Sequence, residues 1–551
     1  MIRTVPFIAF SVLAAALVCG PGVAVAAPDE TLRCLMPRAS GTTPVATYPT
    51  VNANAFWLYA YPGIEYRAYA VCRGGTWPYT YALSGAPSGM TVDWTTGASL
   101  SNTASGRWDT GKITWPNPDV TTGTITLTVT DAVSAQVQVT WTVTVTSATS
   151  RFIFVDCDDA AGGNTGAIGN PYASIDDLYA ARPAHTDKIV YFQPCASTYR
   201  VYDMAGLSGD RKDFHGCCDP MQWLAVPGGT KPTFDVGYIY GGSAGGHVRF
   251  QAGPAAFIGW TCTNVRNKCI NTIDGLSYVV LAENTFDEQH GTAGENPGYW
   301  QGDTGGGWSD FLMILRNEMA NMGQQQTVGG TSASCLKMYA QRYPIVTDNY
   351  CHHSGTANVQ GIDLKGDNQQ TVVRNNLVHD VMSEGIGGNQ QTLENPIWEF
   401  NRVYNCESVS SECIFLNRGG FVHTDAIFRR NSISGRLRIQ EVDALDGPFN
   451  LSNNVLVTAD GVNQYCAQPV GHRIECFGSD TPTRIVEAAA PNDDGVYGTG
   501  DGCMDATALL IGPCASLIGT KGAQLAAGGG ASYPAPPRRL RIGSFATIGG
   551  I

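Results

Sequence analysis

The sequence predicts an all-β protein in two parts, a β-sandwich followed by a long parallel β-helix made of stacked coils. Three observations predict this fold. A motif of an apolar run followed by Asn recurs along the second part of the chain. An earlier segment alternates apolar and polar residues with period 2. A short helical segment lies between them, where a stack of coils needs its open end covered.

The recurring motif is an apolar run, then Asn, then any residue and an apolar residue. Spacings between copies are 33, 32, 26, 26, 30 and 22 residues, a period typical of repeat folds. The copies centre on Asn284, Asn317, Asn349, Asn375, Asn401, Asn431 and Asn453. Because Asn tolerates left-handed backbone geometry and its amide can bond the Asn of the next coil, we expect an asparagine ladder.

Residues 28–148 predict the sandwich. The segment TGTITLTVTDAVSAQVQVTWTVTVTS alternates strictly, with turns every ~8–12 residues. The order PYTY, GMTVD, TLTVTD and VTV, over about residues 60–147, resembles the immunoglobulin-like modules of bacterial surface and secreted proteins. That resemblance implies the fold and says little about function. We expect the Trp and Tyr residues here to be core, and residues 147–150 to be a linker.

Residues 151–530 predict the β-helix, and residues 531–551 form a Gly/Pro-rich tail. The stretch from Arg151 reads as a strand, a Gly/Asn/Asp loop, a helix over Ser174–Ala181 and another strand. It resembles the opening of secreted right-handed parallel β-helix proteins, whose N-terminal helix caps the solenoid.

Residues 1–26 predict a secretory signal peptide. Arg3 precedes an apolar stretch too short to span a bilayer, and Ala24-Val25-Ala26 is a small-residue cleavage site. No later segment predicts a membrane span. We therefore expect a secreted protein, extracellular or periplasmic, with attachment to a cell surface left open.

The cysteines predict disulfides. Of 17 cysteines, 16 remain after Cys19 in the signal peptide, an even number that suits an exported chain. Adjacent Cys217 and Cys218 leave their partners open. The sequence leaves the connectivity open. Pairs that lie close in sequence are Cys262 and Cys269, Cys335 and Cys351, Cys406 and Cys413, Cys466 and Cys476, and Cys503 and Cys514, and plausible longer links are Cys34 with Cys72 and Cys157 with Cys195.

The charge composition argues against nucleic acid as a partner. Charged residues make up 15% of the 551 and the net charge is −13, so no basic stripe exists for nucleic acid. A polyanionic sugar remains open, because a local Lys/Arg cluster or a bound cation would suffice. The sequence does not define the oligomeric state.

The strands after the Asn turns can be laid in register, with Ile362, Ile386 and Ile414 pointing inward. Equivalent positions on successive coils then lie about 4.8 Å apart. The outward positions then form three levels across these strands. The first level contains Gln360, Glu384 and Glu412, the second Asp363, Gly387 and Phe415, and the third Lys365, Asn389 and Asn417, with Arg418 adjoining. The next strand adds Arg438 and Gln440.

This set predicts a lyase for uronate-containing polysaccharide. Such a lyase needs a base for the proton α to the carboxylate and a cation to neutralise that carboxylate. We assign Lys365 as the base and Arg418 or Arg438 as the neutraliser. Calcium prefers oxygen ligands, and the expected ligands are Asp363, Glu384 and Glu412. The expected sugar contacts are Asn389, Asn417, Gln440, Trp300 and Trp308.

The segment GIDLKGDNQQTVVRNN resembles the Lys-containing strand and Asn turn of alginate lyase/chondroitinase B-like β-helix proteins. The resemblance implies the lyase activity and the role of Lys365. The family's Arg-His-Gly strand, expected one coil later, reads EGIGGN here.

Other interpretations stay open. Glu384 and Glu412, one coil apart, suit the ~5–5.5 Å carboxylate pair of a retaining glycoside hydrolase. A non-catalytic protein that binds a cell-surface glycan also fits. Lys365 can be a solvated lysine, and the Trp300 loop can pack back onto the coils. For His352, His353 and His379 we expect polar turn residues rather than ligands or bases.

Overall fold

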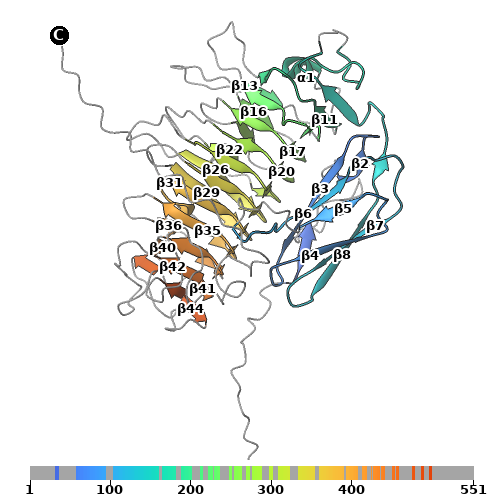
Figure 1. Ribbon diagram of the computed structural model, residues 1–551. Helices are drawn as coiled ribbons and strands as arrows, with labels where there is room; N and C mark the ends of the chain where they lie inside the picture. The colour runs from blue at the N-terminus through green and yellow to red at the C-terminus, as the bar shows by residue number, and fades with distance from the viewer. Residues whose placement is uncertain are drawn as a thin grey trace, which may run out of the picture.

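The computed structural model describes most of the chain between residues 31 and 498 (Figure 1). None of its described helices is long and apolar enough to cross a membrane. The described residues are 31–35, 57–94, 104–159, 164–181, 188–200, 211–214, 221–227, 229–235, 247–250, 254–263, 269–272, 276–287, 297–301, 308–322, 333–353, 359–389, 393–406, 412–417, 423–424, 426–434, 436–440, 449–452, 454–457, 474–477, 485–488 and 496–498.

The N-terminal domain is the predicted β-sandwich. One antiparallel sheet has the order β1 (Arg33–Leu35), β3 (Tyr66–Arg73), β6 (Gly111–Trp115), β5 (Thr91–Asp93). The other has the order β4 (Thr80–Ser84), β7 (Ile125–Thr130), β8 (Gln136–Trp141), while β2 (Tyr59–Ala60) pairs with β9 (Thr144–Val145). Trp57, Trp77, Tyr79, Trp115 and Trp141 are buried, which confirms that aromatic residues build this core.

The second domain is a parallel β-helix with three sheets, here called A, B and C. Sheet A contains β10 (Phe152–Val155), β11 (Lys188–Phe192), β14 (Met221–Ala225), β17 (Ala255–Ile258), β20 (Val279–Ala282), β24 (Met313–Leu315), β27 (Ile345–Thr347), β30 (Val372–Arg374), β34 (Ile397–Glu399), β38 (Ala426–Arg429), β41 (Phe449–Ser452) and β44 (Ile485–Ala488). Sheet B contains β12 (Tyr199–Arg200), β15 (Thr233–Asp235), β18 (Thr261–Thr263), β21 (Thr285–Phe286), β25 (Glu318–Ala320), β28 (Tyr350–His352), β31 (Leu377–Val381), β35 (Arg402–Cys406), β39 (Ser432–Ser434), β42 (Asn454–Val457) and β45 (Val496–Gly498). Sheet C contains β13 (Arg211–Phe214), β16 (His247–Phe250), β19 (Ile270–Thr272), β22 (Pro297–Gln301), β26 (Ala333–Arg342), β29 (Val359–Gln369), β32 (Ile386–Asn389), β36 (Glu412–Asn417), β40 (Arg436–Gln440) and β43 (Ile474–Phe477), with the short β23 (Ser309–Asp310), β33 (Leu393–Glu394) and β37 (His423–Thr424) beside them.

The predicted capping helix is α1 (Ile175–Ala181), at the end of the β-helix where the coils begin (Figure 1). Ser174 is its N-cap residue, because the Ser174 hydroxyl accepts from the Asp177 N–H at 3.1 Å and also donates to the Asp177 carboxylate at 2.7 Å. Ile175 and Leu178 are buried in the solenoid core. The helix therefore covers the apolar interior of the first coils.

The asparagine ladder exists, with one correction. From Asn317 onward, each ladder Asn accepts at Oδ1 from the backbone N–H and the side-chain N–H of the Asn one coil before, at 3.0–3.1 Å. The member between Asn349 and Asn401 is Asn376, not the predicted Asn375. Asn453 lies outside the described residues. The observed members are Asn284, Asn317, Asn349, Asn376, Asn401 and Asn431.

The left-handed backbone lies one residue earlier than expected. In each of six coils the residue just before the ladder Asn has φ between 53° and 61°, which turns the chain and aims the ladder Asn inward. The side chain of that preceding residue, in the cases described below, contacts the N-terminal domain. These six residues, here called the turn column, are Glu283, Arg316, Asp348, Asn375, Phe400 and Arg430.

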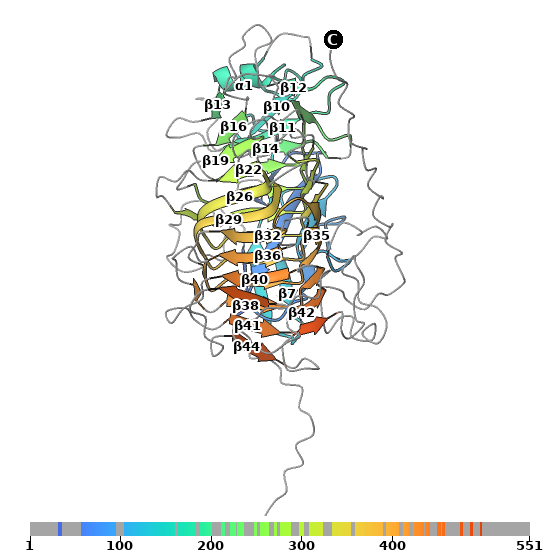
Figure 2. The same ribbon diagram turned by 90° about the vertical axis from the view of Figure 1, so that its left-hand side faces the viewer.

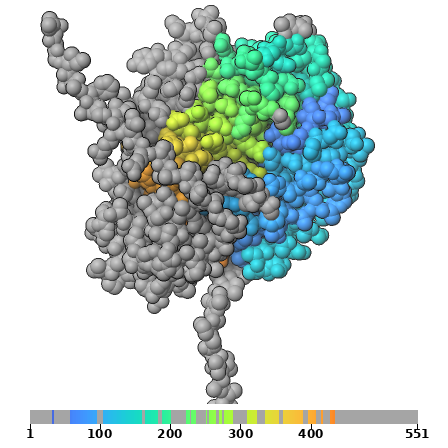
Figure 3. All heavy atoms as spheres, viewed as in Figure 1, coloured from blue at the N-terminus to red at the C-terminus, as the bar shows by residue number. Residues whose placement is uncertain are grey.

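The N-terminal domain packs on the outer face of sheet A, and the two share one hydrophobic cluster. Figure 3 shows the blue atoms of the N-terminal domain against the green atoms of the upper coils. Apolar side chains of β3 and β6 belong to the same cluster as outward residues of sheet A such as Leu224, Ile258 and Leu315. The outer face of sheet A is therefore an internal surface of the protein.

The turn column supplies polar contacts to this interface. Lys112 lies 2.7 Å from a carboxylate oxygen of Glu283. Asp348 accepts from the backbone N–H groups of Asp109 at 2.8 Å and Thr110 at 2.9 Å. Asn375 donates to the carbonyl of Arg107 at 2.6 Å. This explains why Asn375 is outside the ladder.

A buried ionic ladder extends the interface along sheet A. Arg374 donates to Glu399 at 2.7 Å and to Asp109 of the N-terminal domain at 3.2 Å, and each of the three side chains is 1% exposed. Arg429 donates to the other oxygen of Glu399 at 2.5 Å. Burial alone would raise the pKa of Glu399, but Arg429 and Arg374 outweigh it and lower the pKa to about 2.

Replacing Glu399 by Gln is expected to cost about 3–5 kcal/mol at neutral pH, because buried arginines lose their counter-charge. The folded pKa is below its usual 4.5, so this stabilisation is present above pH 4.5 and is lost as the pH falls toward 2. Urea unfolding across that range should show the free energies of unfolding of the parent and the variant converging at low pH.

Glu65→Gln is the control, since Glu65 lies 3.7 Å from Arg67 and is 30% exposed; it should cost under about 1 kcal/mol. A constant difference across the pH range would contradict this assignment.

Five of the expected disulfides are present, namely Cys34–Cys72, Cys157–Cys195, Cys262–Cys269, Cys335–Cys351 and Cys406–Cys413. Cys335–Cys351 and Cys406–Cys413 join strands of sheets B and C, and Cys262–Cys269 joins β18 of sheet B to the residue before β19 of sheet C; all three bridges lie in the solenoid core. Cys217, Cys218, Cys466, Cys503 and Cys514 lie outside the described residues. The observed bridges fit a chain that folds in an oxidising compartment.

Candidate functional site

Sheet C faces away from the N-terminal domain (Figure 2). Its register agrees with the sequence alignment. Ile362 pairs with Ile386 and then Ile414, and all three are buried in the core. The two outward columns of interest are Lys337, Asp363, Gly387, Phe415 and Arg438, and Tyr339, Lys365, Asn389, Asn417 and Gln440.

The outward column is not open to solvent at its centre. Asp363 is fully buried and lies against Lys337, also fully buried, at 3.3 Å between Nζ and Oδ2. Neither oxygen of Asp363 accepts a well-directed hydrogen bond among the described residues. Burial raises the pKa of Asp363 to about 6, although Lys337 and Lys365 act to lower it and Glu384 adds to the rise.

Lys365 and Glu384 lie beside this pair and are half-buried. Glu384 accepts at Oε2 from the Gln360 amide at 2.8 Å and from the Ser383 hydroxyl at 2.5 Å. Gly387 follows Asp363 in the column, and a Cβ there would meet only the Cβ of Glu384, at 3.8 Å, among the described residues. Lys365, the carboxylates of Asp363 and Glu384, and a glycine without a side chain therefore lie on two neighbouring coils.

The remaining predicted site residues are placed to different degrees. Trp300 falls in register with Lys337 on β22, and Glu412 lies on β36 opposite Arg436. For these, and for Asn389, Asn417, Arg438 and Gln440, only the backbone position is described. Arg418 lies outside the described residues. Trp308 is half-buried, with the Arg342 guanidinium 5.7 Å from its ring centre.

The expected calcium ligands fit unequally. Calcium seeks carboxylate oxygens without a neighbouring positive charge, and Lys337 already neutralises Asp363. Glu384 offers an oxygen that is already shared with Gln360 and Ser383. Calcium therefore remains a prediction for Glu384 and Glu412, with Asp363 the poorer ligand.

Lys337 is the residue that the sequence alignment missed. It lies one coil before Asp363, in the strand SCLKMY, which has the same alternation as GIDLKG. Extending the register back by one coil would have placed Lys337 opposite Asp363.

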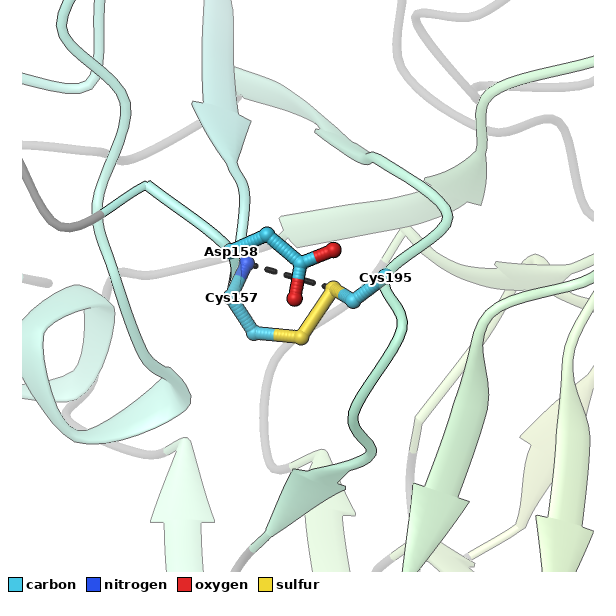
Figure 4. A group of neighbouring side chains, drawn as sticks. All are labelled: Cys157, Asp158 and Cys195. Atoms are coloured by element: carbon cyan, nitrogen blue, oxygen red, sulfur yellow. Dashed lines mark hydrogen bonds between the residues drawn. A yellow bond between two sulfur atoms is a disulfide. The ribbon is translucent and has the colours of Figure 1, made fainter.

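One group of metal-ligand residue types converges elsewhere, at Cys157, Asp158 and Cys195 (Figure 4). The two sulfurs are joined in a disulfide, so they have no thiolate to offer. Asp158 Oδ2 accepts from the Ala196 N–H at 2.7 Å. The group is therefore a structural crosslink near the start of the β-helix.

Comparisons with known proteins bear on the fold. Residues 40–146 match the family model described as "Putative Ig domain", so the N-terminal domain is immunoglobulin-like. A GH136 lacto-N-biosidase from Eubacterium ramulus is similar at 11% identity and a TM-score of 0.38, over 63% of this chain and 66% of that chain, just under two thirds. The catalytic domain of a GH87 alpha-1,3-glucanase in complex with nigerose is similar at 10% identity and a TM-score of 0.18, over 79% of this chain and 87% of that chain. No curated protein matches the sequence. Both solved structures differ too much from this chain to inform its chemistry.

Proposed function

We propose that this protein acts outside the cell on an acidic, uronate-containing polysaccharide, at the outer face of sheet C, and cleaves it by β-elimination. The observation that supports this is that Lys365 and Arg438 lie in two adjacent outward columns of sheet C, in a chain with net charge −13. A local cluster of cations on an acidic protein favours a polyanionic ligand.

The proposed chemistry uses few groups. The Lys365 amine removes the proton α to the uronate carboxylate, and Arg438 or Arg418 neutralises that carboxylate so that the proton becomes acidic. The C4–O4 bond then breaks, a C4=C5 double bond forms, and the departing oxygen takes up a proton. Asn389, Asn417 and Gln440 hydrogen-bond the sugars, and Trp300 and Trp308 stack on them.

Hydrolysis is a second candidate, favoured by Asp363. A carboxyl with a pKa near 6 is suited to donate a proton to a glycosidic oxygen. Glu384 on the next coil would then be the second carboxylate, in place of the Glu384–Glu412 pair that the sequence suggested. Asp363 is buried, so this candidate also requires substrate to reach it.

The test is to incubate the protein with a panel of uronate polymers and follow the absorbance of unsaturated sugar ends. Lys365→Ala is expected to reduce that rate by about 10²–10⁴-fold, the usual contribution of a general base. Lys231→Ala, an exposed lysine near sheet B, is the matched control and should keep full activity.

Each outcome points to one function. New reducing ends without ultraviolet absorbance, lost in Asp363→Asn, would replace elimination by hydrolysis. Glycan binding with no product from any polymer would leave a non-catalytic binding protein and refute both enzymes.

A further inference from the structure

Two neighbouring histidines at the turn after sheet B direct the same ring atom at each other. His352 ends β28, and His353 has left-handed backbone, with φ 53°. Their Nδ1 atoms are 2.5 Å apart. The other nitrogen of each ring faces a carboxylate, at 3.2 Å from His352 Nε2 to Glu318 and at 3.6 Å from His353 Nε2 to Asp380.

This arrangement favours one placement of the ring protons. A neutral imidazole carries one N–H, and a facing carboxylate draws it to Nε2. Both Nδ1 atoms then present lone pairs to each other across 2.5 Å, which is repulsive unless a positive charge lies between or beside them. A shared proton or a metal cation can supply that charge.

We propose that His352 and His353 bind a divalent transition-metal ion of the zinc type through their Nδ1 atoms. Imidazole nitrogens are preferred ligands of such ions, and histidine ligands usually donate their other ring N–H to a carboxylate. Glu318 and Asp380 occupy those second positions and offset the charge of the ion. Two protein ligands leave the remaining positions to water or to an atom of a bound molecule.

The geometry needs only a small adjustment. Zinc–nitrogen bonds of about 2.0–2.1 Å at a tetrahedral angle place two nitrogens about 3.3 Å apart, so the rings must separate by less than about 1 Å. His353 can move, because it is 39% exposed at a turn, whereas His352 is 12% exposed. Tyr350 stacks on the His352 ring at 4.0 Å between centres and holds it in place.

The surrounding groups support the two ligands. His379 is committed on both sides, because Nδ1 donates to Asp380 at 2.8 Å and Nε2 accepts from the Tyr350 hydroxyl at 3.0 Å. Asp380 also accepts from the amide of Asn405. His379 therefore positions the Asp380 carboxylate through a hydrogen bond and is not a third ligand. The sequence predicts ordinary polar turn residues at His352 and His353. The contact of His352 with Glu318 joins residues 34 positions apart on different coils, so no local pattern indicates it.

The proposal is tested by titrating ZnCl₂ into the full chain, purified without a histidine tag and freed of metal with EDTA, using calorimetry and thermal unfolding. We expect one zinc per chain and a higher Tm. His353→Ala should abolish binding, and its unchanged Tm without zinc would show that it folds. Glu318→Gln should weaken binding about 10–100-fold, as loss of a carboxylate behind a ligand does.

Asp158→Asn is the matched control, because it removes the carboxylate of the other group of ligand types, at Cys157 and Cys195. Its zinc affinity should equal that of the parent. The proposal fails if the parent binds no zinc, which would leave a shared proton between the rings. It also fails if His353→Ala binds as well as the parent, or if Asp158→Asn loses the binding.

Discussion

Cutting the chain between its two domains is expected to leave them bound to each other. A protease site inserted into residues 147–150 would break the only covalent linker, yet the domains share a hydrophobic cluster and buried ionic contacts. Arg67 donates to the Ala225 carbonyl at 2.6 Å, and Arg73 donates to Asn395 at 2.9 Å. After cleavage at neutral pH, gel filtration should show one peak that contains both fragments.

Deleting the N-terminal domain is expected to make the β-helix aggregate. Without residues 28–148, outward apolar residues of sheet A such as Leu224 and Ile258 would meet water, and Arg374 would lose Asp109. Exposed apolar patches of this kind promote aggregation. Separate elution of the cleaved fragments, or a soluble and monomeric β-helix after deletion, would show that the interface is weak and that the N-terminal domain is an independent module.

Asn376→Ala is expected to destabilise the β-helix by about 3 kcal/mol. Asn376 Oδ1 accepts from the backbone N–H and the side chain of Asn349, both at 3.0 Å, and the site is fully buried. A buried donor left without a partner costs about 1–3 kcal/mol, and here two lose their acceptor. Urea unfolding measures the cost, and hydrogen exchange should quicken at the amide of Asn349.

Asn375→Gly is the matched variant for that experiment. Glycine keeps the left-handed backbone at φ 56° and removes the side chain that contacts Arg107 and Asp348. Its exchange should quicken at Ser105 of the N-terminal domain, whose N–H donates to Asn375 at 3.0 Å. Equal effects of the two variants on the Asn349 amide would contradict the assignment of Asn376 to the ladder.

The pair Asn375-Asn376 shows how far sequence could lead. The motif located the turn, but either Asn satisfies the pattern of an apolar run before it and an apolar residue after it. The choice depends on which side chain faces inward, and the left-handed residue just before the ladder decides that. Asn375 then serves a partner more than 250 residues away in the chain, at Arg107. No local pattern records such a contact.

The strand register of the candidate site could be predicted from the sequence, but the burial of its side chains could not. Alternation placed Asp363 and Lys365 on the outer face, as observed. The same alternation marks Arg374 and Glu399 as outward in sheet A, yet they are buried under another domain. Period-2 patterns distinguish the two faces of a strand, while burial also depends on what covers the outer face. The raised pKa of Asp363 follows from its burial, which alternation along the strand does not predict.

The turn column bears on how such a protein can be changed. At six successive levels the coil requires one backbone geometry, but the side chain there is Glu, Arg, Asp, Asn, Phe or Arg in turn. The backbone geometry of the solenoid is therefore constant at these positions, while the side chains that contact the N-terminal domain vary. Substituting these positions one at a time offers a way to fit a different module to the same scaffold, with the ladder behind them left untouched.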